Sequence, residues 1–134
     1  MKYLITLMVI LLFTRVNSQN AVSDYFVCDI SQNSTLSITA TDLNKLAKEY
    51  IQNSNITEFK VQKVADHYVL LAKDIAQKLI LVFELKSEGT KLYIDIDKKI
   101  NACESQTLSV SIFKVVDGKI DGCFKGDLKT FSRY

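Results

Sequence analysis

The segment 79–97 constrains the fold most strongly, because its apolar residues recur at every second position on both sides of a polar turn. Such alternation indicates two strands that share one buried face. The turn is expected at the Ser-Glu-Gly-Thr sequence, and pairing Ser87 with Thr90 places Leu85 opposite Leu92. The segment therefore predicts a hairpin with one apolar side.

A second hairpin is expected near the C-terminus. Residues 110–116 and 119–125 flank Asp117-Gly118, a dipeptide that favours a two-residue turn. The turn fixes a register that pairs Val115 with Ile120, Lys114 with Asp121, and Ile112 with Cys123.

One helix is indicated between residues 42 and 52. Its apolar residues follow the i, i+3, i+4 spacing of a single helix face: Leu43, Leu46, Ala47, Tyr50 and Ile51. Thr41 is the expected N-cap, Asp42 in the first turn suits the positive end of the helix dipole, and the Asn-Ser-Asn sequence at 53–55 is expected to end the helix.

Residues 66–78 fit two structures. Their apolar spacing matches a helix, yet the run Tyr68-Val69-Leu70-Leu71 also fits a buried strand after a turn at Asp66-His67. We favour the strand, and expect further strands at 25–30 and 59–64. These elements together predict an α+β fold, in which one amphipathic helix packs on a curved antiparallel sheet of four to six strands.

The first 18 residues have the pattern of a cleavable secretory signal. Lys2 supplies the positive start, residues 4–13 are almost entirely apolar, and Val16 and Ser18 precede the expected cleavage site. The apolar run is too short to span a bilayer, which needs about 20 residues. An uncleaved anchor or a buried N-terminal strand is the alternative. We expect an exported protein, periplasmic or extracellular, with no membrane span after cleavage.

Cleavage leaves residues 19–134 as a single α+β domain. The removed segment holds two of the chain's 17 Lys and Arg residues and none of its 15 Asp and Glu residues, so the remaining chain is neutral. Without a basic stripe, neither a nucleic acid nor an anionic membrane surface is expected as a partner.

The three cysteines, Cys28, Cys103 and Cys123, allow one disulfide in three ways. We favour Cys103–Cys123, because Cys103 precedes the C-terminal hairpin by a short segment and can fold back beside it. A bridge over this span adds about 3 kcal/mol to the free energy of unfolding. Cys28 follows an apolar run, and we expect a buried, inert thiol there.

His67 is the only histidine, and a Cys–His nucleophile pair would need it beside a cysteine thiol. A zinc site of His67 and three cysteines has suitable ligand types, but the spacing matches no compact zinc motif. An exposed turn residue is the favoured interpretation.

Asp95 and Asp97 alternate on one expected strand face, with Glu84 across the hairpin. Two carboxylates on one face suit calcium or acid–base chemistry, although the oxygen-rich loop that calcium needs is missing, so we favour a solvated sheet face. With 4 glycines and no phosphate loop, nucleophile elbow or zinc-protease motif, no catalytic residue, cofactor or metal is expected. The sequons at Asn33 and Asn55 are interpreted as coincidental.

Several segments carry a resemblance: Tyr68-Val69-Leu70-Leu71-Ala72-Lys73, Val82-Phe83-Glu84-Leu85-Lys86, Gly89, Lys91-Leu92-Tyr93-Ile94 and the late cysteines. They resemble a loose set of short exported bacterial proteins of uncharacterised activity, and a signal ending before Gln19 is also similar to theirs. The resemblance implies strands in these segments, and carries over no functional residue.

The favoured function is a non-catalytic exported binding or inhibitor-like module, for another exported protein or a small ligand. The first alternative is a small thiol-active protein or enzyme that uses Cys28 or the pair Cys103/Cys123. The second is a structural envelope or surface component.

Overall fold

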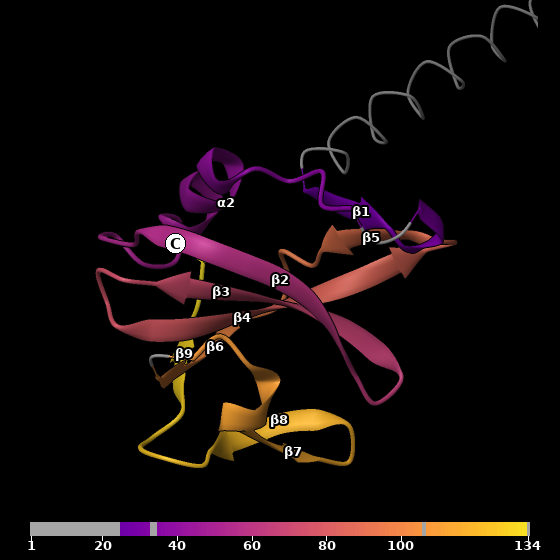
Figure 1. The fold of residues 1–134 in the computed structure, drawn as a ribbon. Helices are drawn as coiled ribbons and strands as arrows, with labels where there is room; N and C mark the ends of the chain where they lie inside the picture. Colours follow the sequence, from indigo (N-terminus) through magenta and orange to yellow (C-terminus); the bar gives the residue numbers. More distant parts are fainter. Residues whose placement is uncertain (1–24, 33–34, 106, 134) are drawn as a thin grey trace, which may run out of the picture.

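The structure, a computed structural model, describes residues 25–32, 35–105 and 107–133. The predicted signal at 1–18 and the sequon residue Asn33 lie outside these ranges. The described residues form one α-helix and nine strands (Figure 1): β1 Phe26–Asp29, α2 Ala40–Ala47, β2 Ile56–Val64, β3 His67–Asp74, β4 Leu79–Glu88, β5 Lys91–Ile94, β6 Ile100–Glu104, β7 Phe113–Val116, β8 Lys119–Cys123 and β9 Lys129–Phe131.

Seven strands form one curled antiparallel sheet with the order β1-β5-β4-β3-β2, to which β6 adds beside β4 and β9 beside β6. The long strand β4 joins the two parts of the sheet, because its residues 79–82 pair with β6 and its residues 85–88 pair with β5. The α+β class with a curved antiparallel sheet is confirmed, but four to six strands was too few. β9 has three residues, which is too short to show an alternating pattern.

The sheet is covered on both faces, with α2 on one side and the β7–β8 hairpin on the other (Figure 1). We call the cluster under the helix the helix-side core; its members include Leu43, Leu70, Leu81, Phe83, Leu92 and Ile94. The hairpin-side core consists of Val64, Val69, Leu71, Ile80, Val82, Cys103, Phe113 and Cys123. β3 and β4 are therefore buried on both faces, which explains their unbroken apolar runs.

The helix begins earlier and ends sooner than predicted. The N-cap is Thr39 rather than Thr41, since the Thr39 hydroxyl accepts a 3.1 Å hydrogen bond from the Asp42 backbone N–H. The α-helix ends at Ala47, after which Tyr50 donates its backbone N–H to the Ala47 carbonyl in a tighter turn. The buried face is as predicted, and Tyr50 still lies in the helix-side core.

Asn44 fastens the helix to the sheet. Its amide oxygen accepts the Ile56 backbone N–H at 2.7 Å, and its amide nitrogen donates to the Ile56 carbonyl at 3.0 Å. This half-buried side chain satisfies both backbone polar groups of Ile56 and so fixes α2 against the start of β2. Near the other end of the chain, Arg133 reaches Glu49 after α2 in a 2.9 Å ion pair.

The β4–β5 hairpin forms with a register shifted by two residues from the prediction. Glu88 pairs with Lys91 and Leu85 with Ile94, so the turn is Gly89-Thr90. A shift of two leaves the same side chains on the buried face. The predicted register would have placed Lys86 against Lys91, whereas the observed one places Tyr93 opposite Lys86 and an acidic residue opposite Lys91.

The β7–β8 hairpin has the predicted turn, with positive φ at Asp117 and Gly118, and the predicted pairing of Val115 with Ile120. Beyond that pair the prediction is wrong. A bulge at Asp121 leaves this residue unpaired, so that Lys114 faces Gly122 and Phe113, rather than Ile112, faces Cys123.

The favoured strand within 66–78 is confirmed as β3. Its turn lies one residue earlier than predicted, at Ala65-Asp66, where Ala65 has a φ of 55°. Because both faces of β3 are covered, one by the helix-side core and one by the hairpin-side core, its side chains on both faces are buried. The helix-like spacing of its apolar residues follows from that double burial.

Candidate functional site

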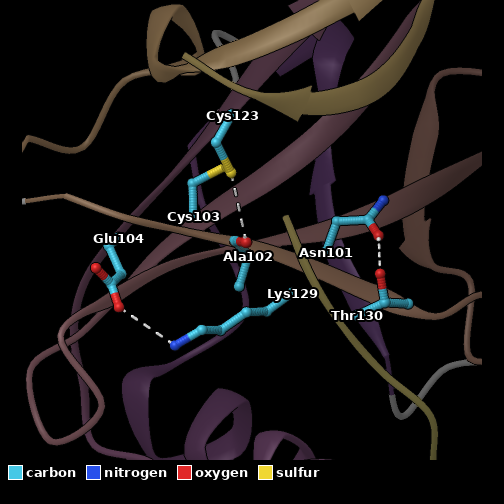
Figure 2. The surroundings of a disulfide bond; sticks show 7 residues. All are labelled: Asn101, Ala102, Cys103, Glu104, Cys123, Lys129 and Thr130. Atoms are coloured by element: carbon cyan, nitrogen blue, oxygen red, sulfur yellow. Dashed lines mark hydrogen bonds and ion pairs between the residues drawn. A yellow bond between two sulfur atoms is a disulfide. The ribbon is translucent and has the colours of Figure 1, made fainter. Parts of the chain in front are cut away.

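The predicted disulfide joins Cys103 on β6 to Cys123 at the end of β8, with 5.8 Å between the two Cα atoms. The bond crosses from the sheet to the hairpin, and the Cys123 sulfur lies 3.8 Å from the Ala102 carbonyl oxygen (Figure 2). On β6, Glu104 forms an ion pair with Lys129 of β9. The disulfide therefore ties the base of the hairpin to the sheet by a covalent bond.

Two further contacts hold the hairpin. Phe113 is buried and packs in the hairpin-side core. At the tip, a methyl group added at Gly118 would lie 3.3 Å from the Ala65 side chain, so the turn approaches the β2–β3 turn closely. Gly118 is favoured there because its φ of 75° suits glycine and because the space is tight.

The hairpin exposes apolar side chains at both of its ends. Phe124, directly after β8, is 70% exposed, Val116 is 51% exposed and Val115 is 43% exposed. We call these three residues the hairpin patch. Neighbouring residues of a strand point to opposite faces. Val115 and Val116 are thus exposed on opposite faces of the ribbon.

Beside Phe124 lies an open hollow of about 870 Å³. It is lined by Gln77, Lys78, Glu104, Ser105, Ser111, Ile112, Phe124, Lys125 and Gly126. The lining residues thus come from three places, which are the β3–β4 turn, the end of β6 and the base of the hairpin. The Lys114 ammonium lies over the Phe124 ring, 6.0 Å from its centroid, which is a cation–π distance.

A second hollow of about 610 Å³ lies at the tip side of the hairpin and contains His67. The His67 ring nitrogens are 3.6 Å from a Glu84 carboxylate oxygen and 3.7 Å from an Asp66 carboxylate oxygen. Lys98, Lys99 and Lys119 also line it, as do Asp97 and Asp117. Its charges are of both signs, and no single ligand charge is selected.

The structure places the predicted cysteines and the histidine apart. Cys28 is fully buried in the helix-side core, and burial raises the pKa of its thiol, which disfavours the reactive thiolate. His67 and Val69 point to the same face of β3, which is the hairpin side of the sheet, whereas Cys28 lies on the helix side. Because Cys103 and Cys123 are bonded to each other, His67 has no free cysteine beside it among the described residues.

Asp95 and Asp97 are not on a strand, because β5 ends at Ile94 and both lie in the loop before β6. This corrects the predicted hairpin end. An Asp95 carboxylate oxygen accepts the Asp97 backbone N–H at 3.1 Å, which stabilises a turn. Across the described ranges, no three His, Cys, Asp or Glu side chains come close enough to hold a metal ion. Asn55 of the second sequon is exposed at the start of β2.

The hairpin patch was missed by sequence reasoning, although a signal for it existed. Cys123 points inward because it bonds to the sheet, so alternation sends the next residue, Phe124, outward. Val116 lies three residues after the inward-pointing Phe113, so alternation sends it to the outer face of the hairpin.

No protein-family model, curated protein or solved structure matches this chain. The α-helix of the described residues has eight residues, and no helix in that part of the chain has the length and apolar character that crossing a membrane requires.

Proposed function

We propose that this protein is an exported, non-catalytic binding or inhibitor-like module that engages its partner through the hairpin patch. One observation carries the proposal. Of the four large apolar side chains that are exposed among the described residues, three lie at the hairpin: Val115, Val116 and Phe124. Apolar side chains gathered on one exposed element are typical of an interaction site.

The way the hairpin is held supports this role. A two-stranded ribbon is only marginally stable by itself in water. Here the disulfide and Phe113 fix its base, while Val115, Val116 and Phe124 are left exposed. The patch is thereby presented in a restricted geometry, which lowers the entropy cost of binding.

Export is supported by the N-terminal pattern and by the disulfide, since disulfides persist in oxidising compartments. N-terminal sequencing of the protein from its native host tests this part. We expect the product to begin at Gln19 and to be found outside the cytoplasm. An intact Met1 form in the cytosol would contradict export.

Binding is tested by crosslinking and capture from the exported fraction of the host. The variants Phe124→Ser and Val116→Ser remove exposed apolar surface from the patch, and Ile75→Ser is the matched control, because Ile75 is 47% exposed on the β3–β4 turn. We expect one captured partner to be lost with both patch variants and retained with the control. Equal capture by all four proteins would refute the role of the patch.

Thiol labelling separates this proposal from a thiol-active protein. We expect Cys28 to react with a thiol reagent only after unfolding, because it is fully buried and its pKa is raised by burial. Rapid labelling of the native protein near neutral pH would instead favour the thiol-active alternative.

A further inference from the structure

The hollow beside Phe124 is rich in positive charge. Lys78 and Lys125 line it, and Lys114 lies over the Phe124 ring. None of these three lysines forms an ion pair with another described residue. Glu104, the acidic residue of the lining, is already paired with Lys129 at 3.3 Å.

This local excess differs from the rest of the chain, in which basic and acidic residues nearly balance. Two further carboxylates are close in sequence, Asp121 on the bulge and Asp127 after Gly126, but neither lines the hollow. Among the lining residues, the two unpaired lysines Lys78 and Lys125 therefore set the sign of the charge that a ligand meets. Lys114 adds a third positive charge over the Phe124 ring.

The lysine over the ring is also held in place. Lys114 pairs with Gly122 across the hairpin, and its Cδ lies 3.7 Å from the position that a Cβ at Gly122 would occupy. Its aliphatic stem thus runs across the glycine, and its ammonium ends over Phe124. An anionic group at the ring edge would meet an ammonium that is already positioned.

We infer that this hollow binds a short acidic segment of a partner polypeptide, with apolar side chains against Phe124 and Ile112 and carboxylates toward the lysines. The inference rests on the proposed function and names the chemistry of the partner. A volume of about 870 Å³ is within the usual range of ligand pockets, roughly 300–1,000 Å³, and suits a few residues.

A polypeptide is favoured over an acidic polysaccharide because of the aliphatic surface. Phe124 stacks equally well on a sugar ring, but Ile112 in the hollow is aliphatic. Its burial is favourable against apolar side chains, which peptides carry and uronic acid polymers lack.

The test is fluorescence anisotropy with the protein produced from the full chain and purified with its disulfide intact. The probes are a labelled peptide that alternates glutamate with leucine, the same peptide with lysine in place of glutamate, and labelled polygalacturonate. We expect the acidic peptide alone to bind, and its affinity to fall as salt is raised toward about 0.5 M, because exposed charges are screened.

Variants then assign the binding to the hollow. The double variant Lys78→Gln/Lys125→Gln is expected to weaken binding of the acidic peptide about 10-fold, since each exposed ion pair contributes up to about 1 kcal/mol. The matched control Lys45→Gln/Lys60→Gln removes two exposed lysines elsewhere, and we expect less than about a 2-fold change.

The outcomes separate this inference from the proposed function. Loss of the host partner with Phe124→Ser, combined with no effect of Lys78→Gln/Lys125→Gln on partner or peptide, would overturn the acidic-segment inference and leave the binding module standing. Binding of polygalacturonate in place of the peptide would also overturn it. If the Phe124→Ser variant captured the host partner as well as the original protein does, the proposed function itself would be overturned.

Discussion

The two faces of the sheet are held in different ways. On the helix side, 19 buried residues of the described chain form one cluster that joins α2, both parts of the sheet and β1. On the hairpin side the buried cluster has 8 residues, and two of them are the disulfide cysteines. The helix-side core is large enough to hold α2 by burial, whereas the hairpin also depends on a covalent bond.

This difference shows how a small domain can keep apolar side chains exposed. Burying the hairpin patch would have held the ribbon by packing and removed the surface that we propose for binding. The disulfide supplies stability that does not depend on covering the patch. The comparison predicts that the two faces respond differently to substitution.

The largest expected effect is on the helix side. Phe83→Ala is expected to lower the free energy of unfolding by about 4 kcal/mol, because Phe83 is one of the largest buried side chains and belongs to the larger core. Phe113→Ala is expected to cost about 2 kcal/mol, since the partly exposed hairpin can settle into the space. Urea unfolding measures both, and a larger loss for Phe113→Ala would contradict the comparison.

Removal of the disulfide is expected to have the next largest effect on stability. The double variant Cys103→Ser/Cys123→Ser is expected to lose about 3 kcal/mol of unfolding free energy, because the unfolded chain regains the freedom of the closed loop. Cys28→Ser serves as the control for a buried cysteine outside the hairpin. Far-ultraviolet circular dichroism is expected to show the helix retained. Loss of the helix would mean that the hairpin supports the whole fold.

A smaller effect tests the cap of α2. Thr39→Ala is expected to cost about 1 kcal/mol, because the Asp42 backbone N–H loses its acceptor. Thr41→Ala, inside the helix, is expected to change stability by less than about 0.5 kcal/mol. Thermal unfolding of the two single variants measures the stability lost at each position. A greater loss for Thr41→Ala would restore Thr41 as the cap.

The smallest expected effect concerns pH. Two hydrogen bonds from Ser31, one from its hydroxyl and one from its backbone N–H, lower the pKa of Asp29 at the end of β1. A carboxyl whose pKa is lowered by folding contributes stability above its unfolded pKa, about 4, and that contribution is lost as pH falls through the folded pKa. Ser31→Ala should therefore make the loss of stability below about pH 4 shallower. If the variant and the original protein lost stability equally below about pH 4, this assignment would be contradicted.

The sequence was sufficient to predict the elements that have a strong period. The spacing of Leu43, Leu46 and Ala47 predicted the buried helix face, and the alternation along β4 predicted which residues enter the helix-side core. The disulfide was predicted because Cys103 lies close to the hairpin in sequence. Each of these features depends on local patterns, which the sequence displays directly.

The remaining features depend on contacts between distant segments. The bulge at Asp121 shifts the register of β8, and an alternating pattern contains no sign of it. The second covered face was not predicted either, because Ile80 and Val82 read as ordinary strand residues until a hairpin packs over them. The hollow beside Phe124 likewise joins β6, the hairpin base and Lys78 of the β3–β4 turn.

The central claim is that the β7–β8 hairpin is held to a self-sufficient sheet largely by its disulfide. Hydrogen–deuterium exchange of the oxidised and reduced protein tests it most directly. We predict that reduction sharply raises exchange in Phe113–Val116 and Lys119–Cys123, while the amides of β3 and β4 stay protected. Loss of protection in β3 and β4 together with the hairpin, or a hairpin that remains protected after reduction, would contradict the claim.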